Sequence, residues 1–248
     1  MKWRVISLQE YPGAMNMALD EAVSEAVREG KSAPTIRFFS WNPSCVTIGY
    51  HQSLEVEVNL EECGQRGFGV VRRVTGGGAV YHDRKGEITY SVVAPEEAFP
   101  KDIIASYKQI CSWIVDGLAE LGVQAEFKPI NDITVGGKKI SGNAQTRRRG
   151  VLHQHGTVLY DLDVATMFGV LRVSKEKISD KLIKGVEERV TSLNRACGAT
   201  RGECYSALLK AFTKGKEFEF GDFSKEEINR AVELAESKYS TREWNFQR

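Results

Sequence analysis

Residues 72–83 read Arg-Arg-Val-Thr-Gly-Gly-Gly-Ala-Val-Tyr-His-Asp. Three consecutive glycines allow the backbone to adopt positive φ and to approach a ligand closely. Successive N–H groups in such a turn form an anion-binding nest, and Arg72 and Arg73 would add charged donors beside it. The segment lacks the Lys-Ser/Thr of a P-loop and the glycine spacing of a dinucleotide-binding loop. On the glycines alone, a flexible hairpin tip with two solvated arginines stays open as the alternative.

A second informative stretch begins at Asn131-Asp132-Ile133 and continues through residues 136–144, Gly-Gly-Lys-Lys-Ile-Ser-Gly-Asn-Ala. The glycine pair predicts a hairpin turn, and strand alternation then places Lys139 and Ser141 on one face and Lys138 and Ile140 on the other. Because Ile140 is suited to the core, we expect Lys139 to face a cleft. A lysine there can stabilise the charge that develops when a carboxylate attacks a phosphate, although a surface lysine is the more common case.

Other polar residues of this half of the chain have two interpretations each. Asp132 could bind Mg²⁺ together with nucleotide phosphates, or it could cap the turn. His153 and His155 share a strand face and could bind zinc, but no third ligand lies nearby in the sequence, so a pocket wall or a structural pair is favoured. Residues 147–149, three arginines, are either a solvated turn or a docking patch for an acidic partner protein.

Composition narrows the class of protein. The 248 residues are 42% hydrophobic and 27% charged, which suits one large or two small globular domains. The 34 Lys+Arg and 33 Asp+Glu leave a net charge of +1, which argues against a nucleic-acid partner. No apolar run reaches the roughly 20 residues that span a bilayer, and the first residues do not resemble a signal peptide, so we expect a cytoplasmic protein with no membrane partner.

The five cysteines are scattered and form no Cys-x-x-Cys pair. In a cytosolic chain this pattern favours reduced thiols over disulfides or a zinc site. Any one of them could still act as a nucleophile. They are Cys45, Cys63, Cys111, Cys197 and Cys204.

Periodicity predicts an α+β fold, in which mixed or antiparallel sheets are flanked by helices, because strands occur in runs rather than alternating with helices. The expected strands are 3–8, 35–39, 45–49, 68–72, 88–93, 124–127, 133–135, 139–145 and 151–160. The expected helices are 15–27, 60–66, 103–121, 205–212 and 225–238, the last with Ser224 as its cap and Glu227 at the capping-box position. From about residue 164 the chain is expected to be mostly helical.

Several motifs in one order resemble the lipoate–protein ligase family, and more broadly the biotin/lipoate ligase and octanoyltransferase superfamily. The matching segments are residues 16–21, 37–38, 49–52, 72–83, 131–132, 138–142, 155–157 and 238–245. The resemblance implies one catalytic domain over residues 1–248 with the biotin/lipoate protein ligase fold, which is similar to that of class II aminoacyl-tRNA synthetases. It also implies that no accessory domain follows, so that a separate small protein is a possible partner.

What the resemblance implies for function is an ATP-dependent lipoate–protein ligase. Such an enzyme uses ATP, Mg²⁺ and lipoate to form lipoyl-AMP, and it then transfers the lipoyl group to a lysine of a lipoyl domain or a glycine-cleavage H protein. Lys139 matches the family's catalytic lysine, which contacts lipoate and the α-phosphate. Asp132 matches a phosphate and possible metal contact. The other residues expected to bind ATP or lipoyl-AMP are Arg73, Gly76, Gly77, Gly78, Ala79, Val80, Tyr81, His82, Ser141 and His155.

Two alternatives remain. Octanoyltransferases of the same superfamily use no ATP and pass the acyl group through a cysteine thioester, and residues 86–91 and 143–147 are similar to one such class. Glu87 also departs from the asparagine or aspartate of many ligases. The transferase cysteine is expected either at Ser141 or in residues 125–138, where this chain has none, and this absence favours the ligase. The second alternative is a non-catalytic protein that binds lipoate or a nucleotide.

Overall fold

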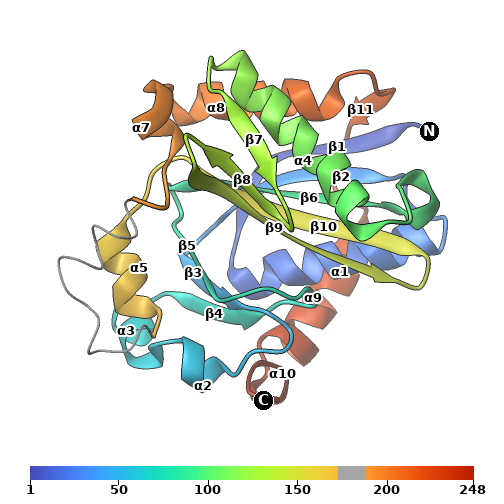
Figure 1. The fold of residues 1–248 in the computed structure, drawn as a ribbon. Coiled ribbons are helices and arrows are strands. Elements are labelled where there is room, and N and C mark those ends of the chain that lie inside the picture. The colour runs from blue at the N-terminus through green and yellow to red at the C-terminus, as the bar shows by residue number, and fades with distance from the viewer. Residues whose placement is uncertain (173–187) are drawn as a thin grey trace.

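The computed structural model describes residues 1–172 and 188–248. Two sheets form its framework (Figure 1). The large one has eight strands in the order β11-β1-β2-β6-β10-β9-β8-β7, and the small one has three in the order β4-β3-β5. The large-sheet strands are β1 (Trp3–Tyr11), β2 (Thr35–Trp41), β6 (Glu87–Pro95), β7 (Ala125–Lys128), β8 (Asp132–Val135), β9 (Lys138–Arg148), β10 (Val151–Leu159) and β11 (Phe218–Phe220). Those of the small sheet are β3 (Cys45–Ile48), β4 (Gly69–Arg72) and β5 (Val80–His82).

Both sheets mix parallel and antiparallel pairs. In the large sheet β1 runs parallel to β2 and β11, whereas the pairs from β2 through β6, β10, β9 and β8 to β7 are antiparallel. In the small sheet β3 is parallel to β4 and antiparallel to β5. The predicted α+β class with mixed sheets is therefore confirmed.

Helices cover the two faces of the large sheet (Figure 1). On one face α4 and α8 bury an apolar stripe that includes Ile110, Ile114 and Phe212 against β2, β6 and β10. On the other face α1 packs with the small sheet and α9, through residues such as Leu19 and Trp41. The helices are α1 (Gly13–Arg28), α2 (Leu54–Glu57), α3 (Leu60–Gln65), α4 (Ile103–Glu120), α5 (Val164–Val170), α7 (Leu193–Cys197), α8 (Arg201–Thr213), α9 (Lys225–Leu234) and α10 (Arg242–Asn245), with short turns η1 (Glu96–Ala98) and η3 (Ala235–Tyr239).

In the described residues from 164 on, the chain forms helices, as expected, and one strand; residues 173–187, which the same expectation covers, lie outside the described residues. The predicted cap of α9 is present as a full capping box, in which Ser224 accepts from the Glu227 amide and the Glu227 carboxylate accepts from the Ser224 amide. The strand β11 was not predicted, and it extends the large sheet by pairing with β1. With Phe218 and Phe220 exposed at the edge of the sheet, its three residues show no buried face that could have indicated a strand.

No helix in the described part of the chain is long and apolar enough to cross a membrane.

Candidate functional site

A cavity of about 290 Å³ lies between the small sheet and the strands β9 and β10 of the large sheet. Most of its wall is apolar, with contributions from Met17, Trp41, Leu159, Met167 and Leu171. It also gathers residues from both informative sequence stretches. The predicted residues from these stretches are Arg73, Gly77, Gly78, Ala79, Val80, Tyr81, His82 and Lys139, and β10 adds the predicted His155. Segments that are far apart in the sequence thus face one cavity. Its apolar wall suits a largely apolar ligand.

Arg73 holds the glycine-rich loop, residues 76–78, in place. Its guanidinium donates to the carbonyls of Gly76 (2.9 Å) and Gly78 (3.0 Å) and to the Thr47 hydroxyl (2.6 Å). Burial lowers the pKa of Arg73 to about 10, so the group stays charged at neutral pH. Within the described residues the amides of residues 76–78 donate to no protein acceptor. Arg73 therefore organises the loop, and the loop keeps free N–H donors beside the cavity.

Glycine at position 49 is required by the close approach of this loop. A Cβ atom built on Gly49 would lie 2.0 Å from the Gly77 carbonyl oxygen, and Gly77 itself has a φ of +98°. Any side chain at position 49 would therefore push the loop out of place.

The neighbouring Arg72 has a different role from the one predicted. Strand alternation turns it away from Arg73, and it lies fully buried. It donates to the carbonyls of Gly49, Tyr50 and Gln52, and to those of Trp244 and Asn245 near the C-terminus. Arg72 is thus a structural cross-link rather than a ligand donor.

Lys139 lies at the cavity, as predicted, and forms an ion pair with Asp132. Its Nζ atom is 2.7 Å from Asp132 Oδ1, and the two side chains remain 42% and 36% exposed. The backbone of Lys139 also bonds to Arg189 and Thr191, so the segment after the undescribed residues lies against this strand. The pair thus places a half-exposed cation at the apolar cavity, with a carboxylate beside it.

Asp132, Ser141 and Gly76 do not line the cavity. Asp132 forms an ion pair with Lys139. Among the described residues, Asp132 belongs to no cluster of three His, Cys, Asp or Glu side chains close enough to share a metal ion. One carboxylate already paired to a lysine does not build a Mg²⁺ site by itself. Ser141 is fully buried, because a register shift between Ile133 and Thr134 interrupts the alternation that would have placed it beside Lys139.

His82 is fixed by a hydrogen-bonded carboxylate. Its Nδ1 lies 2.7 Å from Glu87 Oε1, its Nε2 lies 2.8 Å from Thr47 Oγ1, and its ring stacks on Trp41. These three contacts fix the orientation of the His82 ring. Glu87, which departs from many ligases, therefore orients a histidine of the cavity wall.

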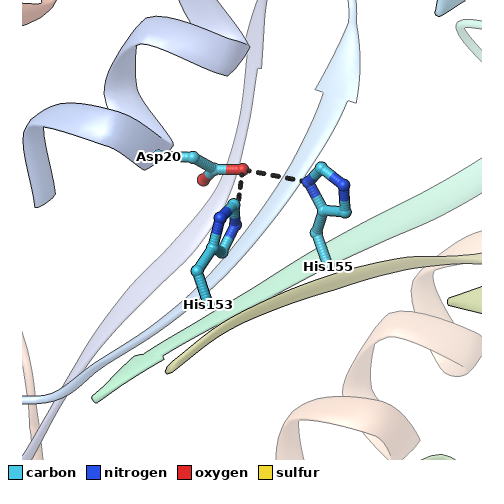
Figure 2. A group of neighbouring side chains, drawn as sticks. All are labelled: Asp20, His153 and His155. Atoms are coloured by element: carbon cyan, nitrogen blue, oxygen red, sulfur yellow. Dashed lines mark hydrogen bonds and ion pairs between the residues drawn. The ribbon is translucent and has the colours of Figure 1, made fainter. Parts of the chain in front are cut away.

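His153 and His155 meet a third group that the sequence did not indicate. Figure 2 shows both rings, from β10, turned toward Asp20 on α1. Asp20 Oδ2 lies 3.2 Å from His153 Nε2 and 3.4 Å from His155 Nδ1 (Figure 2), and Asp20 Oδ1 lies 3.0 Å from Arg37. Burial alone would raise the pKa of Asp20, but His153, His155 and Arg37 hold it well below its usual range.

All five cysteines lie in the described residues, and none lines the cavity. Four are buried, and Cys197 is exposed on α7. Burial raises the pKa of Cys63 and Cys204 to about 11 and that of Cys111 to about 12, and it raises that of Cys45 further. Since the thiolate is the nucleophilic form, the buried four are poor nucleophiles.

Of the arginines of residues 147–149, Arg147 and Arg148 end β9, and Arg149 lies in the turn to β10. Arg148 and Arg149 line a second cavity of about 230 Å³, together with Arg28, His153 and Lys238. The docking of an acidic partner at this turn stays a prediction.

Comparison with known proteins places these features in one family. The family described as lipoyl protein ligase A/B catalytic domain matches residues 12–213. Among curated proteins, the octanoyltransferase LipM of Brevibacillus brevis is 36% identical and that of Kyrpidia tusciae is 38% identical, each match covering at least 99% of both chains. Others include the LipM proteins of Geobacillus kaustophilus and Clostridioides difficile, at 36% and 34%.

Solved structures with the same fold are described as ligases. A bi-partite lipoate protein ligase from Thermoplasma acidophilum is 34% identical with a TM-score of 0.88, covering 99% of this chain and 96% of that one. A lipoate–protein ligase A bound with ATP is 32% identical with a TM-score of 0.85, covering 99% of both chains. The predicted lipoate ligase catalytic-domain fold is confirmed.

The expectation of an ATP-dependent ligase is corrected by the curated relatives. Full-length relatives at 32–38% identity are octanoyltransferases, which was the disfavoured alternative. The prediction gave most weight to a cysteine missing from two expected positions. The relatives agree instead with residues 86–91 and 143–147, which resemble one transferase class. The first of these segments contributes Thr89 to the cavity wall, and its Glu87 contacts His82 of that wall.

Proposed function

Because the chain belongs to the lipoyl protein ligase A/B catalytic-domain family, we propose that it is an octanoyltransferase that loads an octanoyl group onto a lysine of a lipoyl-domain protein. The observation that carries this proposal is the match to octanoyltransferases over essentially the whole chain. The acyl donor is a thioester, and the acceptor class is taken from the lipoyl domain named with the Thermoplasma ligase.

The cavity supports this proposal through its wall and its rim. A medium-length acyl chain can be buried against Met17, Trp41 and Leu171. Its thioester carbonyl would then lie near the Lys139 ammonium and the free amides of the glycine-rich loop. Donors of this kind stabilise the oxyanion that forms when an amine attacks a carbonyl.

The transfer proposed here proceeds directly from the thioester to the acceptor lysine. The acceptor amine forms a bond to the acyl carbon, the carbon–sulfur bond breaks, and the donor thiol leaves with the proton that the amine loses. No cysteine lines the cavity, and residues 173–187 contain none. The chain therefore offers no thiol at the cavity for an acyl-enzyme intermediate.

Intact-mass spectrometry of an acceptor lipoyl domain tests the proposal. One reaction contains the enzyme and an octanoyl carrier-protein thioester without ATP, and a parallel one contains free octanoate or lipoate with ATP and Mg²⁺. We expect one octanoyl increment in the first reaction, and no increment when the acceptor lysine is replaced by arginine. Modification that needs the free acid and ATP, or no modification in either reaction, would overturn the proposal.

A further inference from the structure

His155 and His153 share one carboxylate but differ in their second contact. Both residues are buried, and each ring has a nitrogen within 3.4 Å of Asp20 Oδ2. Of these two contacts, that of His155 has the geometry of a hydrogen bond. Only His155 reaches the glycine-rich loop, because its Nε2 lies 2.8 Å from Thr75 Oγ1. His153 faces the second cavity instead. His153 is therefore a control for His155, because it lies beside the same carboxylate but does not contact the loop.

The hydrogen positions around His155 follow from Asp20. The Asp20 carboxylate is ionised and can only accept, so His155 Nδ1 carries the proton that faces it. Burial lowers the pKa of His155 to about 4, which keeps the ring neutral with this single proton at neutral pH. Its Nε2 atom is therefore an acceptor, and the Thr75 hydroxyl donates to it.

Thr75 is the residue from which the loop departs. Its carbonyl accepts from the Tyr50 amide at 2.9 Å, and the next carbonyls, of Gly76 and Gly78, are held by Arg73. The chain of contacts from Asp20 through His155 to Thr75 thus anchors the start of the loop to α1. Rigid support of this kind keeps binding groups in their productive geometry.

A metal ion is the alternative occupant of this cluster, because the three ligand atoms lie within 4.8 Å of one another. Arg37 already neutralises Asp20, and the buried Arg73 lies on the other side of Thr75. A divalent cation would add two charges to a buried site that holds a single carboxylate. The contacts favour a hydrogen-bonded cluster without a metal.

We propose that His155 is a positioning residue for acyl transfer, which anchors the glycine-rich loop to Asp20 through the Thr75 hydroxyl. This inference rests on the proposed octanoyl transfer for its catalytic consequence. Its structural consequence, the fixed position of the Thr75 carbonyl, can be measured without any substrate.

The test compares His155→Phe with His153→Phe. Both variants keep an aromatic ring and remove a ring nitrogen beside Asp20, and His155→Phe also removes the acceptor of the Thr75 hydroxyl, so we expect the larger loss of thermal stability in His155→Phe. Exchange of the Tyr50 amide, measured by NMR or hydrogen–deuterium exchange, should accelerate about fivefold in His155→Phe, the equivalent of one hydrogen bond, and stay unchanged in His153→Phe. In the transfer assay, His155→Phe should raise the KM for the octanoyl thioester more than it lowers kcat.

Variants of Thr75 complete the test. Thr75→Ser keeps the hydroxyl and should behave like the wild type, whereas Thr75→Val should reproduce the effect of His155→Phe on the Tyr50 amide. Equal exchange in both histidine variants, or stoichiometric zinc in the purified wild type that either variant loses, would overturn the positioning role. Altered exchange in a protein that shows no octanoyl transfer would leave the anchoring of the loop by His155 standing and refute the proposed function instead.

Discussion

Lys139 Nζ lies 2.7 Å from Asp132 Oδ1 at the cavity, yet the two side chains remain 42% and 36% exposed. Exposed ion pairs contribute only about 0–1 kcal/mol to stability, so substrate can break this one at little cost. The pair thus keeps the lysine in place without burying its charge. This arrangement suits a group that must turn from a carboxylate to a developing oxyanion during the reaction.

The first prediction is that Lys139→Ala removes most of the transfer activity without unfolding the protein. Loss of an oxyanion-stabilising donor lowers kcat by about 10²–10³-fold, while the free energy of unfolding should change by no more than about 1 kcal/mol. Lys128→Ala is the matched control, because Lys128 also forms an exposed pair, with Glu126, but does not line the cavity. Steady-state kinetics and urea unfolding measure both effects, and equal activity in the two variants would remove Lys139 from the mechanism.

A second prediction concerns the contact between Gly49 and the glycine-rich loop. Gly49→Ala should displace the Gly77 carbonyl, at a cost of about 1–3 kcal/mol, and should lower the rate of acyl transfer. Gly64→Ala is the control, since Gly64 lies in α3 with open space around its Cβ position and should gain about 0.4–1 kcal/mol. Thermal unfolding and transfer rates of the two variants provide the comparison, and full activity in Gly49→Ala would contradict the close approach.

The third prediction is an acid sensitivity that depends on His155. Burial lowers its pKa to about 4 in the folded protein, against an ordinary value of about 6.5 when unfolded. The unfolded state therefore binds the proton first, so the free energy of unfolding is highest above pH 6.5 and falls as the pH drops toward 4, by up to about 3 kcal/mol. Urea unfolding between pH 7.5 and pH 4 measures this slope. It should be smaller in His155→Phe, and an unchanged slope would mean that His155 is not the titrating group.

How far the sequence predicts this site depends on how local each relationship is. The Gly136-Gly137 turn and the apolar Ile140 correctly place Lys139 at the cavity, because both signals lie within a few residues. The same alternation fails for Ser141, because a β-bulge interrupts the period of two. The residue pattern does not indicate where this bulge lies.

Contacts between residues that are far apart in the sequence could not be predicted for a different reason. Asp20 and His155 are separated by 135 positions, and nothing in the spacing of either segment indicates that α1 packs on β10 at that point. The opposite roles of Arg72 and Arg73 were closer to being predictable, because consecutive strand residues face opposite sides and only one of them could reach the cavity.

The last prediction concerns the cysteines and separates direct transfer from a thioester intermediate. N-ethylmaleimide should modify one thiol of the native protein, Cys197, because it is the exposed cysteine and burial raises the pKa of the other four. Cys197 lies outside the cavity wall. The modified enzyme should therefore transfer the octanoyl group from the thioester donor at the same rate as the unmodified enzyme, and so should Cys197→Ser. Denaturing mass spectrometry after mixing with donor alone should reveal no octanoyl adduct on the enzyme. A hydroxylamine-sensitive adduct on any cysteine, or loss of transfer on alkylation, would contradict the direct route.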